Sequence, residues 1–417
     1  MDKQELRTYR DIFEIELRDD ILAYWLTHAP ERDSGGFYGA VDLENQPVLS
    51  ANKACVLNAR ILWTFSAAAQ CYADERYARM AERAYRVLTN DFADPLHGGF
   101  FMELTPDNRP ADAIKHTYAQ AFALYALCKY FAYRPNDMVL KQIQQLYRLL
   151  EEQAKDPCHP GYGEAFTRDW QPLEVNRMAD NNEPRSMNTH LHVLEAYAAL
   201  YKVWPDPSVK ARLRELLLLF LDHIIRPSGP LGIFFDLDFN ETAASRAVCS
   251  FGHDIEAAWL LWEAVEILGD PDILQRMRPT SLRMLAAVER DGFDKDGGLF
   301  LESTRYGSHV RTNKHWWLQA ETLVGMLHGY QLTGLPKYWG NVKLAWSFID
   351  QHVIDHERGE WFTKVNRHGQ PYLTEPADDP SPYYRNDWKI DPWKCPYHNG
   401  RACLELIRRI DQILQIY

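Results

Sequence analysis

Polar residues suited to acid–base chemistry recur at matched places in this chain of 417 residues. They lie near the starts of otherwise apolar, helix-length segments. The set comprises Asn58, Arg60, His116, Tyr118, Asn188, His192, Glu195, His253, Glu256, His315, Trp316, Trp393 and His398. Residues three or four apart share one face of a helix, so the spacing predicts an imidazole–carboxylate pair from His192 and Glu195 and a second from His253 and Glu256.

These side chains offer complementary roles toward a substrate. Histidine has an unperturbed pKa of about 6.5 and can take and give a proton near neutrality, and a carboxylate beside it supports its charged form. Arg60 stays protonated and is suited to holding an oxyanion. Trp316, Trp317 and Trp393 offer flat apolar faces of the kind that stack on sugar rings. Together they predict a carbohydrate pocket that works by acid–base chemistry.

Each of these residues also has a purely structural interpretation. A single buried histidine more often satisfies a local hydrogen bond than catalyses a reaction. Arg60 could form a structural ion pair, and the tryptophans could pack in the core. Recurrence at several equivalent helix ends favours the functional interpretation, because local packing does not require it.

Six glycine–aromatic marks divide the chain at intervals of 61 to 69 residues. They begin at Gly36, Gly99, Gly163, Gly232, Gly298 and Gly359. Each is followed by an alternating stretch and a polar turn, which predicts a hairpin. A helix pair cannot bury both of its faces alone, whereas six stacked pairs can close into a ring. We therefore expect an all-α, double-layered barrel that forms one domain over residues 1–417; an open α solenoid is the alternative.

Helical periodicity predicts twelve helices, two for each mark. They cover residues 6–26, 54–71, 77–88, 113–131, 139–153, 187–203, 209–225, 251–268, 271–288, 315–332, 339–353 and 399–416. Alternate members, beginning with 54–71, are rich in alanine and poor in charge, as expected for an inner layer packed on both sides.

Composition excludes several classes of partner. A net charge of -12 opposes binding to a nucleic-acid backbone. The seven cysteines are scattered and form no C-x-x-C pair, so we expect neither a disulfide framework nor a thiolate zinc site. The start of the chain lacks the apolar core of a signal peptide, and no window is apolar enough to span a membrane. We expect a cytoplasmic protein with a small-molecule partner, and the oligomeric state stays open.

Three longer strings resemble motifs of a known family. They are RSMNTHLHVLEA at residues 185–196, GHDIEAAW at 252–259 and WKCPYHNGR at 393–401. They resemble signatures of the N-acylglucosamine 2-epimerase superfamily, most closely of its cellobiose and mannose 2-epimerases. The resemblance spans the chain and implies an (α/α)6 barrel with short β-hairpins in the connecting loops. It also implies a reducing sugar as substrate, no required cofactor, and reversible inversion at C2.

The resemblance assigns roles to ten matching positions. By it, His253 and His398 are the two C2 acid–base groups, Glu256 supports His253, and Arg60 and His192 contact the carbonyl oxygen and the enediolate. The sugar-binding positions are Tyr118, Asp180 and Asn188, which hold hydroxyls, and Trp316 and Trp393, which flank the sugar. The implied mechanism opens the sugar ring, removes the C2 proton to give a cis-enediolate, rotates C2–C3 and returns a proton to the opposite face.

The segment at residues 376–392 bears on the size of the sugar. It is longer than we expect in a cellobiose 2-epimerase, and long loops of this kind are often lids. A lid here would fill the space of a second sugar unit, which favours interconversion of D-mannose and D-glucose. A solvated loop would instead fit the alternative, a cellobiose 2-epimerase acting on the reducing-end glucose of β-1,4-linked disaccharides.

Three other function classes fit less well. A glycosidase needs two carboxylates flanking the glycosidic bond, whereas the predicted helix ends carry histidines. A metal-dependent aldose–ketose isomerase would show close ligand spacing such as H-E-x-x-H, which the sequence lacks. A non-enzymatic helical scaffold or binding protein would not need the complete set of polar residues.

Overall fold

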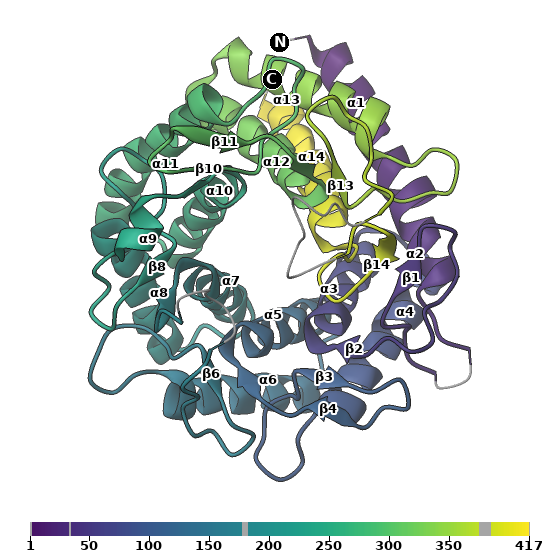
Figure 1. Cartoon of the computed structure of the whole chain (residues 1–417), viewed down its shortest axis with the longest axis vertical. Helices are drawn as coiled ribbons and strands as arrows, with labels where there is room; N and C mark the ends of the chain where they lie inside the picture. The colour runs from purple at the N-terminus through teal and green to yellow at the C-terminus, as the bar shows by residue number, and fades with distance from the viewer. Residues whose placement is uncertain (1, 33–34, 177–181, 375–384, 417) are drawn as a thin grey trace.

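The computed structural model describes residues 2–32, 35–176, 182–374 and 385–416. Over these ranges the helices form two concentric layers (Figure 1). The inner layer consists of α3 (Cys55–Cys71), α5 (Thr117–Tyr133), α7 (Met187–Val203), α10 (Phe251–Leu268), α12 (Trp316–Thr333) and α14 (Tyr397–Ile416). The outer layer consists of α1 (Lys3–Ile15), α4 (Glu75–Arg86), α6 (Asp137–Leu149), α8 (Pro207–Leu219), α11 (Pro271–Asp291) and α13 (Pro336–Phe348).

The inner layer is a closed ring. Each inner helix packs against the next, and α14 packs against α3 and against α1 of the outer layer. The expected (α/α)6 barrel is therefore confirmed, and the open solenoid is wrong. Across the described ranges, none of the helices has the length and apolar character needed to cross a membrane.

The two layers differ in sequence because they differ in environment. Outer helices are amphipathic: α4 buries Tyr77, Met80, Ala81 and Ala84 on one face, and the Asp74 side chain caps its first turn by accepting from Arg76 N–H. Inner helices are apolar nearly all round, since both sides are covered. Five outer helices end in wider π-type turns, η1 (Glu16–Leu22), η2 (Val87–Phe92), η3 (Leu150–Ala154), η4 (Phe220–Ile224) and η5 (Ile349–Val353), which periodicity does not predict.

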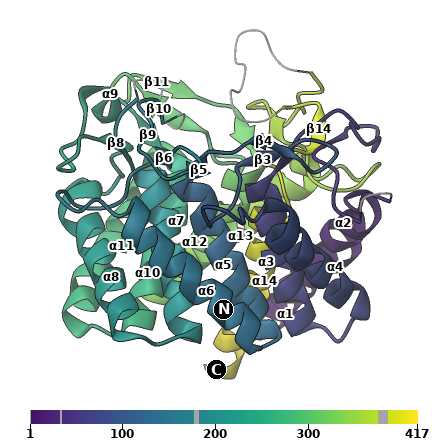
Figure 2. The ribbon, with the colours of Figure 1, turned by 90° about the horizontal axis from the view of Figure 1, so that it is seen from below.

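Short antiparallel strands gather at one end of the barrel, where the inner helices begin (Figure 2). The strand before an inner helix pairs with the connection of the next repeat. The pairs are β2 (Lys53–Ala54) with β3 (Glu103–Leu104), β5 (Lys115–His116) with β6 (Ala165–Phe166), β7 (Arg185–Ser186) with β8 (Phe234–Phe235), β9 (Cys249–Ser250) with β10 (Glu302–Thr304), and β12 (Lys314–His315) with β13 (Lys364–Val365). The last pair, β14 (Trp388–Ile390) with β1 (Val41–Asp42), joins the two ends of the chain.

The expected hairpins are present but short. Two carry a second strand, β4 (Pro110–Asp112) beside β3 and β11 (His309–Arg311) beside β10. The others close through single bridges, such as Val41 with Pro47. In the third and fourth repeats the position equivalent to Phe37 and Phe100 is Tyr162 and Leu231, so the marks chosen at Gly163 and Gly232 are displaced by two residues.

In four inner helices the fourth residue bonds a residue of the glycine–aromatic region, which is one reason why the marks recur. Gln120 accepts from the Phe100 backbone N–H at 2.9 Å, and Gln319 accepts from Leu299 N–H at 2.8 Å. His190 and Asp254 do the same for Tyr162 and Leu231, at 3.0 Å and 2.7 Å. One helix position thus holds each of these rim strands, and His190 is a structural histidine.

A buried ion pair recurs around the same rim. A basic residue near each inner helix start pairs with an acid that follows an outer helix: Lys53 with Glu31 (2.5 Å), Lys115 with Asp94 (2.9 Å), Arg185 with Asp156 (2.5 Å), Lys314 with Asp294 (3.2 Å) and Lys389 with Asp355 (2.8 Å). In the fourth repeat the charges are reversed, because Arg226 occupies the acid's position and pairs with Glu241 at 2.5 Å. The pairs tie each strand to the outer layer.

Buried carboxylates join the first and last parts of the chain where the ring closes. Glu360 accepts from Nε1 of Trp25, a residue of α2 (Ala23–His28), at 2.6 Å. It also accepts from Nζ of Lys394, which lies just before α14, at 2.9 Å. In η1, Glu16 accepts from Trp361 Nε1 at 2.6 Å and Asp20 accepts from Glu360 N–H at 2.9 Å. The first helices, the sixth connection and the last helix are therefore held by one acidic cluster.

Burial and the neighbouring charge of Asp20 raise the pKa of Glu16 well above its usual value, and burial and Glu360 raise the pKa of Asp20 to about 6. The folded state therefore keeps protons that the unfolded chain releases above about pH 4, so the cluster's contribution to stability falls as pH rises.

We expect Glu16→Gln to raise the melting temperature at pH 8 by a few degrees and to change it less at pH 5. The amide keeps an acceptor for Trp361 and never ionises. Thermal unfolding at both pH values checks this, with Asp19→Asn, an exposed neighbour on the same turn, as the control for removing one negative charge. Equal gains in the two variants would show that overall charge, not this cluster, is responsible.

Candidate active site

Chemically active side chains occupy one level of the inner ring. The sixth residues of five inner helices are Arg60, Phe122, His192, Glu256 and Glu321, and the fifth residue of α14 is Arg401. All six are buried. The Arg60 guanidinium lies 4.2 Å from the centre of the Phe122 ring, and that ring lies 4.6 Å from His192. The same helix position thus supplies the groups that meet inside the barrel.

Arg401 lies at the centre of this level and is 2% exposed. Its Nη1 donates to Glu195 Oε1 at 2.5 Å, and its Nη2 donates to Glu256 Oε1 at 2.8 Å and Glu321 Oε1 at 2.6 Å. The hydroxyl of Tyr397 donates to Glu195 Oε1 at 2.7 Å. One buried guanidinium therefore bridges three buried carboxylates from three helices and supplies one positive charge against them.

Two of these carboxylates hold imidazoles. His192 Nδ1 lies 2.9 Å from Glu195 Oε2, as the sequence predicts, and His398 Nδ1 lies 2.7 Å from Glu321 Oε1. Burial lowers the pKa of His192, and burial and the charge of Arg60 lower the pKa of His398 well below its usual value. Both rings are neutral near pH 7, with Nδ1 fixed by its carboxylate and Nε2 left for a substrate.

The pKa values of Glu195 and Glu256 are shifted in opposite directions. Burial favours the neutral acid, but Arg401 and His192 hold the pKa of Glu195 at about 2. Burial and the charge of Glu321 raise the pKa of Glu256 to about 8. Glu256 therefore carries a proton near neutrality, which reduces the repulsion between carboxylates around Arg401.

The expected pair of His253 and Glu256 is not formed. His253 Nδ1 lies 2.7 Å from Ser250 Oγ, whereas Glu256 bonds Arg401 and lies 3.9 Å from His398 Nδ1. The spacing of three residues places His253 and Glu256 on one helix face. The Glu256 carboxylate nevertheless bonds Arg401, because a hydrogen bond from a charged guanidinium is stronger than one from a neutral imidazole. The carboxylate that directly bonds His398 is Glu321.

Trp317 lies between the two histidines expected to act at C2. The distance between ring centres is 4.9 Å to His253 and 5.6 Å to His398. Trp316 instead is 2% exposed, with the Nζ of Lys394 5.9 Å from its ring centre. Of this tryptophan pair, Trp317 is the one in contact with the imidazoles, and a role of Trp316 beside the sugar stays a prediction.

Arg60 lies at the same level of the ring, on α3. Its Nη2 donates to Tyr118 Oη at 2.8 Å and its Nη1 to the Trp393 carbonyl at 3.2 Å. Its Nε is buried and has no hydrogen-bond partner among the described residues. The rings of Tyr118 and Trp393 lie 5.7 Å apart. Arg60 therefore keeps an unused donor close to two side chains expected to bind sugar.

One further predicted binder, Asn188, lies on α7. Asn188 is its second residue and shares a face with His192, and its Oδ1 is buried without a hydrogen bond in the described part of the chain. The predicted binder Asp180 lies outside the described residues, as do residues 376–384 of the expected lid.

Sequence reasoning missed Glu321 and Arg401, and it named Trp317 as a sugar-stacking face without giving it a site role. Glu321 is the one charged residue of α12, as Arg60 is of α3, and that contrast was an available signal. Arg401 lies within the WKCPYHNGR string but its partners are distant in sequence. The resemblance assigned the flanking role to its neighbour, Trp316.

The cluster also offers ligand atoms that a metal could use. Single atoms of Glu256, Glu321 and His398 lie within 4.8 Å of one another. The two carboxylates already accept from Arg401, so a divalent cation placed among them would be repelled by a fixed positive charge. The chemistry of this donor set therefore fits a guanidinium better than a metal.

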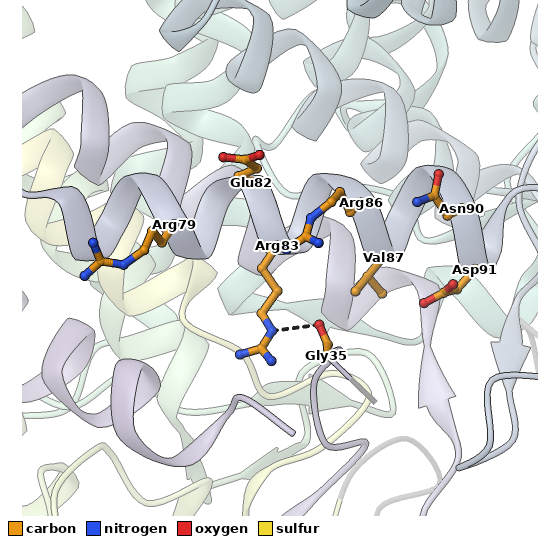
Figure 3. A pocket seen from close by; sticks show the side chains of 8 residues that line it. All are labelled: Gly35, Arg79, Glu82, Arg83, Arg86, Val87, Asn90 and Asp91. Atoms are coloured by element: carbon orange, nitrogen blue, oxygen red, sulfur yellow. Dashed lines mark hydrogen bonds between the residues drawn. The ribbon is translucent and has the colours of Figure 1, made fainter. Parts of the chain in front are cut away.

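A separate groove of about 570 Å³ lies on the outer wall along α4 (Figure 3). Its lining includes Arg79, Arg83 and Arg86, and Arg83 Nε donates to the Gly35 carbonyl at 2.7 Å. It contains none of the inner-ring residues and is not part of the candidate active site.

Comparison with known proteins agrees with the fold and the motifs. Residues 36–385 match the model of the family N-acylglucosamine 2-epimerase (GlcNAc 2-epimerase). The chain is 37% identical to a protein of Bacteroides fragilis named cellobiose 2-epimerase, over 94% of this chain and 97% of that one. The structure of cellobiose 2-epimerase from Spirochaeta thermophila is 39% identical, covers 99% of this chain and 98% of that chain, and superposes with a TM-score of 0.87. That from Bacillus thermoamylovorans is 34% identical, covers 97% and 100%, and gives 0.89.

Arg401→Met is expected to destabilise the protein by about 3–5 kcal/mol, because three buried carboxylates lose their common partner. The loss should shrink at pH 5, where protonation of those carboxylates becomes easier. Arg401→Lys keeps the charge and should lose less. Urea unfolding at pH 5 and 8 measures both.

Arg79→Met serves as the control, because the Arg79 side chain is 67% exposed and its ion pair with Glu75 lies on the surface. We expect it to change stability by less than about 0.5 kcal/mol. A similarly small effect at Arg401 would mean that the carboxylates do not depend on it.

Proposed function

This chain belongs to the N-acylglucosamine 2-epimerase family and is a sugar 2-epimerase, and we propose that its substrate is a β-1,4-linked disaccharide such as cellobiose. In this proposal the reacting centre is C2 of the reducing-end glucose. The support is that relatives 37% and 39% identical, matched over nearly the whole chain, are named cellobiose 2-epimerases.

The expectation of a free monosaccharide rested on the segment at 376–392. Most of that segment lies outside the described residues. Its described end is tied to the start of the chain, because β14 pairs with β1. The relatives therefore favour the disaccharide, and interconversion of mannose and glucose becomes the second candidate.

The observation that carries the mechanism is the placement of two imidazoles beside one indole. His253 and His398 come from different helices and both contact Trp317. Epimerisation at C2 needs a base on one face of the carbon and an acid on the other. We assign these roles to Nε2 of the two histidines, because Nδ1 of each is already occupied by Ser250 or Glu321.

The enediolate needs a fixed positive charge. The C2 proton next to an aldehyde is far less acidic than imidazolium, so the developing oxyanion must be stabilised by several kcal/mol. Arg60 offers its unused Nε inside the barrel, and His192 offers Nε2, since Glu195 holds Nδ1. We assign both to the carbonyl oxygen. Rotation about C2–C3 then presents the other face to the second histidine, which returns a proton.

Solvent exchange tests the reaction and the substrate together. We expect incubation in heavy water to give epimerisation of cellobiose faster than of mannose or glucose, with deuterium at C2 of the product. NMR of C2 follows both. Retention of the original hydrogen would contradict the two-histidine mechanism, faster turnover of mannose would favour the second candidate, and no turnover of any aldose would favour a scaffold or binding role.

His253→Ala and His398→Ala are each expected to lower kcat by at least about 10²-fold, as is typical for loss of a general acid or base. The buried structural histidine provides the control: His190→Gln keeps an acceptor for Tyr162 N–H and should retain activity if it folds. Circular dichroism and initial rates on cellobiose measure the three variants. Near-normal turnover without either His253 or His398 would remove that residue from the mechanism.

A further inference from the structure

Ser250 occupies a helix-capping position without capping the helix. It is the residue before α10, with the extended backbone typical of an N-cap (φ -94°, ψ 101°). A serine there normally accepts a hydrogen bond from a backbone N–H of the first turn. Its hydroxyl instead lies 2.7 Å from Nδ1 of His253, the third residue of the helix.

The neighbouring repeat provides an internal comparison. Ser186 stands at the same position before α7, and its Oγ accepts from the backbone N–H of Thr189 at 3.2 Å. Thr189 and His253 are both the third residue of their helices. Two serines at equivalent positions thus differ in partner: one bonds the helix backbone and the other bonds the imidazole.

We propose that Ser250 is a positioning residue for His253, and that its hydroxyl holds Nδ1–H so that Nε2 faces C2 of the sugar. This inference rests on the proposed role of His253 in proton transfer. When the ring acts as a base, Nε2 must carry the lone pair, so the proton is on Nδ1 and needs an acceptor. When the ring becomes imidazolium, the same Nδ1–H donates to the same oxygen. The hydroxyl can therefore serve both states without moving a proton itself.

Among the described residues, the His253 ring makes no side-chain hydrogen bond other than the one to Ser250. Trp317 packs against the ring. Burial lowers the pKa of His253 to about 4, and the titratable groups His192 and Glu321 act on that pKa through space. Glu256, which the sequence had placed here, bonds Arg401. Without Ser250 the ring would keep its packing but lose the contact that fixes its tautomer and tilt.

The test compares Ser250→Ala with Ser186→Ala. We expect Ser250→Ala to lower kcat about tenfold with KM nearly unchanged. The acidic limb of the kcat/KM profile should move to lower pH, because the imidazolium loses an acceptor that favours it. Ser186→Ala should lower the melting temperature by a few degrees and leave kcat and the pH profile unchanged.

Two further variants keep the outcome decisive. Ser250→Thr retains a hydroxyl and should restore kcat to within about twofold of the wild type. Ser250→Gly removes the hydroxyl at a position where glycine is a tolerated cap, so it replaces Ser250→Ala if that variant does not fold. Wild-type kcat and pH profile in Ser250→Ala or Ser250→Gly would overturn the inference, as would an equal loss of kcat in Ser186→Ala.

The experiments distinguish the proposed role of His253 from the positioning role of Ser250. If His253→Ala retained near-normal turnover, proton transfer by His253 itself would be wrong. If His253→Ala were inactive but Ser250→Gly behaved as wild type, only the positioning role would be wrong.

Discussion

A single buried cation organises the interior of this barrel. Arg401 donates to Glu195, Glu256 and Glu321, and two of these carboxylates hold His192 and His398. Three carboxylates could not be buried together without a compensating charge, because the desolvation of each costs several kcal/mol. The orientation of both imidazoles therefore depends on a residue that makes no hydrogen bond to either. It also depends on closure of the ring, since Arg401 belongs to the last helix.

The repeated architecture separates structural from chemical positions. In four inner helices the fourth residue bonds the connection at the rim, as Gln120 and Gln319 do, while the sixth lies at the level of Arg401. Rim pairs such as Lys115 with Asp94 anchor the helix starts from outside. A rigid rim lets the sixth position change from arginine to histidine to glutamate without altering the backbone that presents it. This is a physical reason why one ring of similar helices can assemble unlike groups.

The sequence could predict the elements far better than the contacts between them. Periodicity and the marks gave the helices and the ring, because burial on one or two sides leaves a local pattern. The pair of His192 and Glu195 was also predictable, since both lie on one helix. The partner of His398 was not: Glu321 lies 77 residues away, and the carboxylate of Glu256 also lies near the ring, 3.9 Å from Nδ1. Such choices depend on charge and distance across the ring, which spacing along one helix does not contain.

The two histidines beside Trp317 are held by chemically different partners. Nδ1 of His398 meets the Glu321 carboxylate, and Nδ1 of His253 meets a neutral hydroxyl. A carboxylate favours imidazolium more than a hydroxyl does, but His398 also lies in the fields of Arg60 and Arg401, which oppose its protonation. The Glu321 carboxylate thus opposes the repulsion between Arg60, Arg401 and a protonated His398, a repulsion that is weaker at His253. In the proposed mechanism both arrangements serve one end, because each occupies Nδ1 and leaves Nε2 for proton transfer at C2.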